Sequence, residues 1–454
     1  MMSRSLHCTL LLASVLVSLP AEADAQLSLN DVQALVEESS PNVDAAVARV
    51  QASEAMLQVA RSYWRPTVTA TAGYRYDSLE QELVPATLYE PLSPWLNAIA
   101  AQTPGLPAAD ALLRDSSTPI ELSPQHAVQG EIALIQPLLA PTASAARRIA
   151  EARISADDES RRATVFVVRL AVTETFFEVL RYEGLAEAAS AAVAQTNAEV
   201  DRARARVAEG VATPFELDAA RTLSQRALRD QLAAESAALI ARDALHELIG
   251  AGLSEPLSTP APGLRPSSHV QAQDEALAAS SELSAAEARS ALARSALAAE
   301  DATFYPTAQA RLAARAQRPT GVTADRFAWT ASIGIEWTLF AGGARNAQRQ
   351  AASAQLDARD AATAGAERRV VGEVRRLWLQ LDQADLDVDL AEAELQLAER
   401  ALDLARSART EGVGTNVDVE VALERRNASE RARVLANVRV LRVEAMLELW
   451  TGGV

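Results

Sequence analysis

The sequence predicts an α+β fold, mainly α, in which one helix–strand–strand–long helix unit occurs twice. The first observation behind this prediction is a recurring turn sequence, because residues 209–217 (EGVATPFEL) resemble residues 411–419 (EGVGTNVDV). The second is two pairs of segments with alternating polarity. The third is two long stretches without an internal proline, 143–208 and 344–410. A repeat of this length indicates one large structural unit used twice.

Residues 1–25 have the features of a secretory signal peptide. Arg4 supplies a positive charge, residues 10–17 form a short apolar core, and residues 23–25 (ADA) form an Ala-x-Ala cleavage motif. We therefore expect cleavage before Gln26. The only cysteine, Cys8, would leave with the signal, so the mature chain would have no disulfide and no cysteine metal site.

Two similar repeats, 26–252 and 271–454, are expected on either side of a proline-rich, non-helical linker at 253–270. Each repeat has a helical segment, 41–63 in the first and 281–303 in the second. Each segment is followed by a proline, Pro66 or Pro306, where the helix cannot continue.

Strands are predicted at about 66–77, 126–137, 306–317 and 326–339, because apolar and polar residues alternate there with a period of two. Alternation over about ten residues is typical of a transmembrane β-strand. Trp329 and Trp337 share the apolar face and would lie roughly 26 Å apart along the strand. They therefore fit two aromatic girdles in contact with outer-membrane lipid. The alternative is a soluble sheet with one buried face.

The two proline-free stretches predict helices roughly 100 Å long. The second has apolar residues at heptad spacing, which is typical of a coiled-coil seam. A further stripe of Leu390, Leu397 and Leu404 lies beside that seam. Two seams imply that the helix contacts neighbours on both sides.

The recurring turn would end each long helix and start another near Phe215 and Val417. Its glycine would supply a left-handed conformation. Thr213 and Thr415 are predicted helix caps, each with an acidic residue three positions later, Glu216 or Asp418.

Composition excludes several function classes. The net charge of −17 provides no basic surface for nucleic acid. The four histidines are scattered, and the sequence contains no phosphate-binding glycine loop with lysine and no cluster that suggests a catalytic triad. We therefore predict no enzyme activity, no cofactor and no metal site.

The ordered set of signal peptide, repeated helix–strand–strand–long helix units and repeated turns resembles the TolC family of outer-membrane efflux proteins. The resemblance covers essentially the whole mature chain. Independently, four strands leave two open edges that cannot face lipid, so several chains must share one barrel. The family implies a homotrimer, with a twelve-stranded β-barrel continued into the periplasm by an α-helical barrel.

The resemblance also implies a function in the cell outer membrane. The chain would form the exit duct of a tripartite efflux pump or a type I secretion system. Its partners would be a periplasmic adaptor (membrane fusion) protein and an inner-membrane transporter, which supplies the energy. The alternative is a soluble periplasmic coiled-coil adaptor or structural protein, and the strand alternation with its tryptophans favours the channel.

Residues at the two turns are the candidate sites. Similarity to the family's periplasmic tip predicts an adaptor-docking surface formed by Gly210, Val211, Ala212, Thr213, Gly412, Val413, Gly414 and Thr415. The first copy departs from the family pattern at Ala212. Acidic residues beside the turns would line the periplasmic entrance: Glu216, Asp218, Asp418 and Glu420. Alternatively, these carboxylates only stabilise the positive end of the helix dipole.

Overall fold

The protein is described by a computed structural model. The structure describes residues 26–76, 78, 81–84, 87, 90–106, 108, 120–123, 125–250, 255–261, 263, 265–318 and 326–453. The signal peptide expected at 1–25 lies outside the described residues. The described chain is mainly helical with a small antiparallel sheet, which confirms the α+β, mainly α class.

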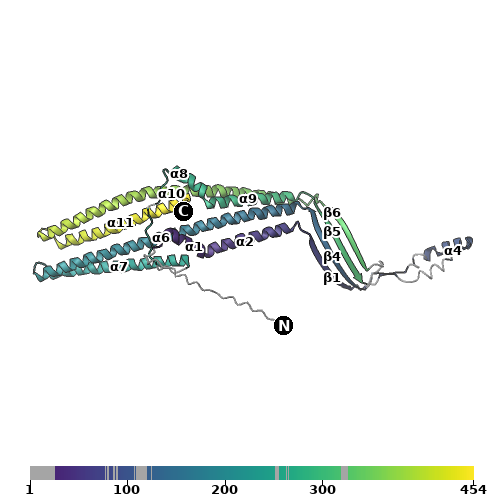
Figure 1. Cartoon of the computed structure of the whole chain (residues 1–454), viewed down its shortest axis with the longest axis horizontal. Coiled ribbons are helices and arrows are strands. Elements are labelled where there is room, and N and C mark those ends of the chain that lie inside the picture. Colours follow the sequence, from purple (N-terminus) through teal and green to yellow (C-terminus); the bar gives the residue numbers. More distant parts are fainter. Residues whose placement is uncertain are drawn as a thin grey trace, which may run out of the picture. The chain divides into compact units, whose positions relative to one another are not determined.

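The same order of helices and strands occurs twice (Figure 1). The first repeat consists of α1 (Leu29–Ser39), α2 (Pro41–Ser62), β1 (Thr67–Tyr76), β4 (His126–Leu139), α6 (Pro141–Ala208) and α7 (Pro214–Ile249). The second consists of α8 (His269–Ala279), α9 (Ser281–Ala302), β5 (Thr307–Arg318), β6 (Phe327–Glu336), α10 (Ala344–Thr410) and α11 (Asn416–Thr451). The predicted duplication is therefore confirmed.

Several elements have no counterpart among the sequence predictions. The short helices α1 and α8 precede α2 and α9. Between β1 and β4 lie β2 (Gln81–Leu83), η1 (Glu90–Leu92), α4 (Ser93–Gln102) and β3 (Ile120–Ser123). Strands β2 and β3 pair with each other in a separate two-stranded sheet. Strand β6 ends at Glu336, before the expected end near residue 339.

The chain divides into two compact units. The helical unit contains the described residues up to Ala46, Arg161–Leu283 and those from Ala366 onward. The sheet unit contains Val47–Ser160 and Ser284–Gly365. Helices α6 and α10 contribute residues to both units.

Each repeat supplies its own apolar core to the helical unit. The first cluster joins α1, α6 and α7 through buried residues that include Val32, Val36, Phe176, Phe177, Leu245 and Ile249. The second joins α8, α10 and α11 through Ala272, Ala276, Val370, Val374, Leu377 and Val443, among others. Burying one apolar side chain such as Val32 or Val36 of α1 stabilises the fold by about 1.5–3 kcal/mol. Helix α8 buries the small residues Ala272 and Ala276 against α10 and α11. None of the helices in the described residues combines the length and the apolar character needed to cross a membrane.

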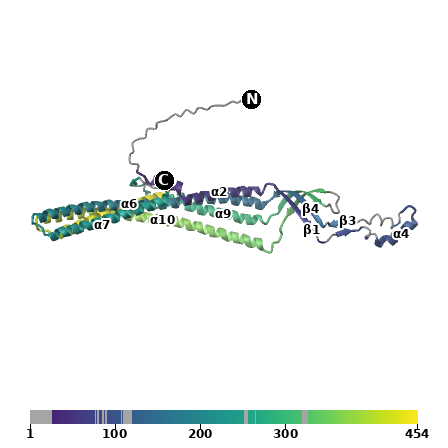
Figure 2. The ribbon, with the colours of Figure 1, turned by 90° about the horizontal axis from the view of Figure 1, so that it is seen from below.

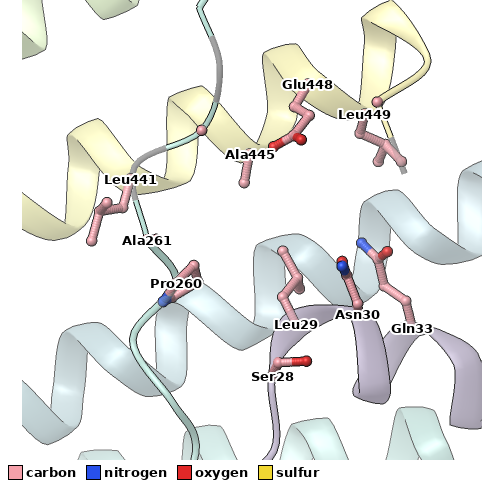
Figure 3. A pocket seen from close by; sticks show the side chains of 12 residues that line it. Ser28, Leu29, Asn30, Gln33, Pro260, Ala261, Leu441, Ala445, Glu448 and Leu449 are labelled. Atoms are coloured by element: carbon pink, nitrogen blue, oxygen red, sulfur yellow. The ribbon is translucent and has the colours of Figure 1, made fainter.

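The linker between the repeats is anchored to the helical unit. Leu27 forms a parallel bridge with Leu257, and its N–H donates to the Pro256 carbonyl at 3.0 Å. Arg265 pairs with Asp385 of α10 at 2.7 Å and with the buried Glu444 of α11. Beside these contacts is a pocket of about 250 Å³ lined by α1, the linker and α11 (Figure 3).

The sheet unit contains a four-stranded antiparallel sheet in the order β1-β4-β5-β6 (Figure 1). Its register matches Ile132 of β4 with Ala70 of β1 and Ala314 of β5, and Ala314 with Trp329 of β6. Cross-strand partners share a face, so the apolar residues of all four strands lie together. The opposite face carries Arg75, Glu131, Arg311, Arg315 and Glu336.

Candidate functional site at the helical turns

The two repeated turns have the same backbone geometry. Gly210 (φ 72°) ends α6, and Gly412 (φ 77°) ends α10, both in the left-handed region that favours glycine. The next residue of each turn, Val211 or Val413, donates its N–H back to the last turn of the helix at 3.0 Å. This pattern satisfies carbonyl groups that a helix end leaves free. Both turns lie at the same end of the helical unit (Figures 1 and 2).

The tip residues of the two turns, Gly210–Thr213 and Gly412–Thr415, differ at one position. A Cβ on Gly414 would lie 3.0 Å from both Ala408 Cβ and Arg409 N, so only glycine fits there without a shift. The first turn carries Ala212 at the equivalent place. The N–H of Gly414 also donates to the Ala408 carbonyl at 2.9 Å.

Apolar side chains at the turns are strongly exposed. Phe215 and Val413 are each 80% exposed, and Val211 and Val417 are exposed as well. Exposed apolar residues gathered at one end of a helical unit are typical of a protein-binding surface. The structure thus brings the predicted docking residues of both turns to one end of the molecule's helical unit.

Capping boxes fix the start of the helix after each turn. Thr213 Oγ1 accepts from the Glu216 N–H at 3.4 Å, and Glu216 Oε1 accepts from the Thr213 N–H at 3.3 Å. In the second turn, Asp418 Oδ2 accepts from the Thr415 hydroxyl at 2.7 Å and from its N–H at 2.8 Å. These hydrogen bonds lower the pKa of Asp418 below its ordinary value. Both acidic residues therefore complete the helix caps that the sequence predicts at Thr213 and Thr415.

A polar network joins the two turns. Asn416, the first residue of α11, donates to Glu216 Oε2 of α7. Its Oδ1 accepts from Arg206 at 3.3 Å and from Arg409 at 3.4 Å. The network therefore includes residues from α6, α7, α10 and α11.

Next to this network lies a buried carboxylate that no sequence pattern predicts. Glu199 of α6 is only 6% exposed. It accepts from Arg406 at 3.0 Å and from Arg409 at 3.2 Å, and it also pairs with Arg202 of its own helix. A buried carboxylate requires such partners. No sequence signal distinguishes Glu199 from the many other acidic residues on α6, because its partners come from a helix about 200 residues away.

The other two predicted entrance residues have different surroundings. Asp218 is exposed and pairs with Arg221 at 3.1 Å. Burial raises the pKa of Glu420, and the neighbouring Glu424 raises it further, while Arg226 of α7 opposes the shift. Glu420 thus lies between the two helical hairpins, whereas Asp218 faces solvent.

The tryptophans occupy opposite ends of the apolar sheet face. Trp329 lies on β6 and is exposed. Trp337 follows directly after the end of β6 and donates from Nε1 to the Phe304 carbonyl at 3.0 Å. Further exposed aromatic residues lie near the same end as Trp337: Tyr63, Trp64, Tyr305 and Phe340.

Comparison with known families shows to which protein family the chain belongs. A family model described as outer membrane efflux protein matches residues 33–251 and 272–453, which is most of the sequence. The chain belongs to the outer membrane efflux protein family. The two matched segments lie on either side of the linker, so each contains one of the two repeats.

Solved structures of outer-membrane channels share this fold. The outer membrane protein VceC from Vibrio cholerae is 19% identical, with 94% of this chain and 96% of that chain covered and a TM-score of 0.72. CusC is 13% identical, with 94% and 92% covered and a TM-score of 0.75. The CmeC outer membrane channel of Campylobacter jejuni is 14% identical, with 94% and 85% covered and a TM-score of 0.70. A search of curated proteins found no match.

Family membership confirms the resemblance to the TolC family and the outer-membrane location. The efflux protein is therefore a channel of the outer membrane, and the alternative of a soluble periplasmic adaptor is not supported.

Proposed function

We propose that this efflux protein assembles as a homotrimer whose three sheets close into a twelve-stranded β-barrel in the outer membrane. The helical units would continue the barrel as a tube in the periplasm. The assembly would serve as the passive exit duct of a tripartite efflux pump or a type I secretion system. It needs no catalytic site, because an inner-membrane transporter would supply the energy.

The observation that carries this proposal is the division of the four-stranded sheet into one apolar and one charged face. The apolar face has no cover among the described residues, since Tyr74, Ile132, Trp329 and Ile333 are all exposed on it. A sheet that faces lipid on one side and water on the other has this pattern. On the polar face, Arg311 of β5 pairs with Glu131 of β4, as expected for the wall of a water-filled channel.

The edges of the sheet support a shared barrel. In the described residues, the outer edges of β1 and β6 have no strand partner. Unpaired backbone groups cannot face hydrocarbon, and a closed barrel needs about eight strands or more. Pairing β6 of one copy with β1 of the next would satisfy both edges, and three copies would give twelve strands.

A second exposed surface supports the same assembly. Leu390, Leu397 and Leu404 of α10 are exposed at heptad spacing, while Ala391, Ala398 and Leu402 of the same helix are buried. One seam is therefore filled within the chain, and the other remains for a neighbouring copy.

The helical turns are the proposed site of partner contact. The exposed residues of Gly210–Thr213 and Gly412–Thr415 would dock a periplasmic adaptor protein, and Glu216, Asp218, Asp418 and Glu420 would surround the entrance. Trp329 and Trp337 would contact the two lipid interfaces. The support for the docking role is the exposure of Val211 and Val413 at the turns, and the support for the lipid contacts is the exposure of Trp329 and Trp337.

Fractionation and conductance test the proposed function. The expressed protein should enter the outer membrane as an oligomer that resists SDS and dissociates on heating, and the purified oligomer should conduct ions across a planar bilayer. Release of the protein by osmotic shock, or a monomer that does not conduct, would contradict the proposal.

A further inference from the structure

We propose that the apolar sheet face ends in a binding site for the phosphate group of an anionic lipid in the outer leaflet, with Arg318 as the residue that binds the phosphate. The proposal rests on the proposed function, because it requires this face to contact lipid. We call the site the outer rim and define it by Tyr74, Tyr76, His126, Arg318 and Phe327.

The register places these residues together at one end of the sheet. Tyr76 pairs with His126, Tyr74 with Val128, and Val128 with Arg318. Phe327 pairs with Ala316, two residues before Arg318 on β5. Cross-strand partners share a face, so Arg318 lies on the apolar face although it is charged.

The outer rim is the end of the sheet farthest from α2, α6 and α9, whereas the short helix α4 belongs to the connection between β1 and β4 on the side of the outer rim. Strands β1 and β5 begin directly after α2 and α9, and β4 ends directly before α6. In an antiparallel sheet these three strand ends lie together, and the outer rim lies at the opposite end (Figure 1). With the helices in the periplasm, the outer rim would therefore face the cell exterior.

The depth of Arg318 fits the level of lipid headgroups. From Thr307 to Arg318, strand β5 extends about 36 Å at about 3.3 Å per residue. A tilt of about 40° reduces this to about 28 Å across the membrane, close to the apolar band of about 25 Å in outer-membrane barrels. Trp329 pairs with Ala314, so Arg318, four residues further along β5, would lie about 10 Å beyond the aromatic girdle of Trp329. With Trp329 and Trp337 at the two lipid interfaces, Arg318 would therefore reach the headgroup layer.

The guanidinium group of Arg318 is available to a ligand. The side chain of Arg318 is exposed, and among the described residues its guanidinium makes no hydrogen bond or ion pair, although its backbone belongs to the ladder between β4 and β5. Arg311, on the opposite face of the same strand, pairs with Glu131. A cation next to hydrocarbon is costly unless it reaches the polar interface, and the long side chain of arginine allows this.

Aromatic rings flank the cation in a fixed arrangement. Tyr74 Oη and His126 Nδ1 are hydrogen-bonded at 2.6 Å, and the rings of Tyr76 and His126 lie 5.0 Å apart. Phe327 is exposed near Arg318. Aromatic residues favour the border between hydrocarbon and headgroups, so they would place a lipid beside the guanidinium.

The chemistry of the outer rim favours a phosphorylated lipid. A guanidinium binds phosphate with two parallel hydrogen bonds. Free phosphate would gain only these bonds, whereas a lipid would also place its acyl chains on the apolar face below Arg318. The occupant is therefore a membrane lipid with a phosphate headgroup, such as the phosphorylated glycolipids of outer leaflets.

Native mass spectrometry of the purified oligomer with diphosphorylated lipid A tests the proposal. Replacing Arg318 by Gln (R318Q) should weaken lipid binding roughly ten- to hundredfold, the loss expected for hydrogen bonds to a charged group. The matched control is R315Q, which removes a charge from the opposite face of the same strand and should leave binding unchanged. R318K, which keeps the charge but not the paired hydrogen bonds, should give an intermediate loss and serves if R318Q fails to assemble.

Equal lipid binding by wild type and R318Q, or an equal loss in R315Q, would overturn the proposal. Full displacement of the lipid by millimolar inorganic phosphate would show an ordinary anion site and would also overturn it. Bilayer conductance of the same preparations tests the channel function independently of the lipid site. If wild type and R318Q oligomers both conduct and bind lipid equally, the lipid site is wrong and the channel function still stands.

Discussion

Asn416 at the start of α11 donates a hydrogen bond to Glu216 at the start of α7, so the first turns of two helices 200 residues apart in sequence are joined directly. Glu216 also caps its own helix through Thr213. Asn416 accepts from Arg206 and Arg409 on the two long helices. Separating the two hairpins at this end therefore requires several polar contacts to break.

Neutralising the two capping acids should open the entrance. In the double variant Glu216→Gln and Asp418→Asn, both cap charges are lost and the contact between Glu216 and Asn416 loses its ionic character. We expect a higher single-channel conductance in planar bilayers. The control is Glu209→Gln, which removes an exposed charge next to the first turn. A closed-state conductance equal to that of wild type would contradict an entrance role for these acids.

Removing the buried carboxylate of Glu199 should destabilise the helical unit. Glu199→Ala leaves Arg409, which is nearly buried, without its main anionic partner. Breaking a buried pair in this way costs about 3 kcal/mol, which should appear as a clear decrease in Tm. The matched control is Asp201→Ala on the same helix, whose pair with Arg204 is exposed and should contribute about 1 kcal/mol or less. Similar Tm values for the two variants would show that the ion pairs of Glu199 contribute no more to stability than the exposed pair of Asp201.

Asp418 and Glu420 should affect stability with opposite pH dependence. The pKa of Asp418 is lowered on folding, so its carboxylate stabilises the fold above pH 3.8, and this contribution is lost as the pH falls through the lowered pKa. The pKa of Glu420 is raised from 4.5, so the stability cost of ionising it in the folded state grows above pH 4.5 and is complete once the pH exceeds the raised value.

At pH 7, Asp418→Asn should therefore lower Tm and Glu420→Gln should raise it. Thermal melts followed by circular dichroism from pH 7 down to the acid limit of folding check this. The gain in Glu420→Gln should vanish below about pH 4.5, whereas the deficit in Asp418→Asn should begin to shrink below pH 3.8 and vanish only below the lowered pKa of Asp418. Shifts of the same sign at pH 7 would refute the assigned environments.

Gly414 should be less tolerant of a side chain than its counterpart in the first turn. In Gly414→Ala, the new Cβ would lie 3.0 Å from Arg409 N, so the turn must shift. We expect a loss of about 1–3 kcal/mol, as for other overpacked sites. The reciprocal change, Ala212→Gly, adds no contact and should be close to neutral. Urea unfolding of the two variants compares them, and equal stabilities would argue against the close approach at Gly414.

The elements that the sequence predicted well are those with long periodic patterns. Strand β6 (Phe327–Glu336) shows alternating polarity, and helix α10 (Ala344–Thr410) contains no proline. Both patterns depend only on the spacing of neighbouring residues, so a single sequence is enough to predict these elements. Helices α1 and α8 were missed because each is short and is held by contacts with long helices distant in sequence. The same reason applies to Glu199 and Asn416, whose partners are brought together only by folding.

The exposed leucine seam on α10 should hold neighbouring copies together. Leu397 and Leu404 are exposed in the single chain, and their burial against a second copy would contribute roughly 1.5–3 kcal/mol each. Replacing both by Asn should therefore dissociate the oligomer in detergent without unfolding the monomer, as measured by light scattering and circular dichroism. The control replaces Glu394 and Arg400, exposed polar residues of the same helix, by Asn. An oligomer as stable in the leucine variant as in the control would show that this seam contacts something other than another copy of the chain.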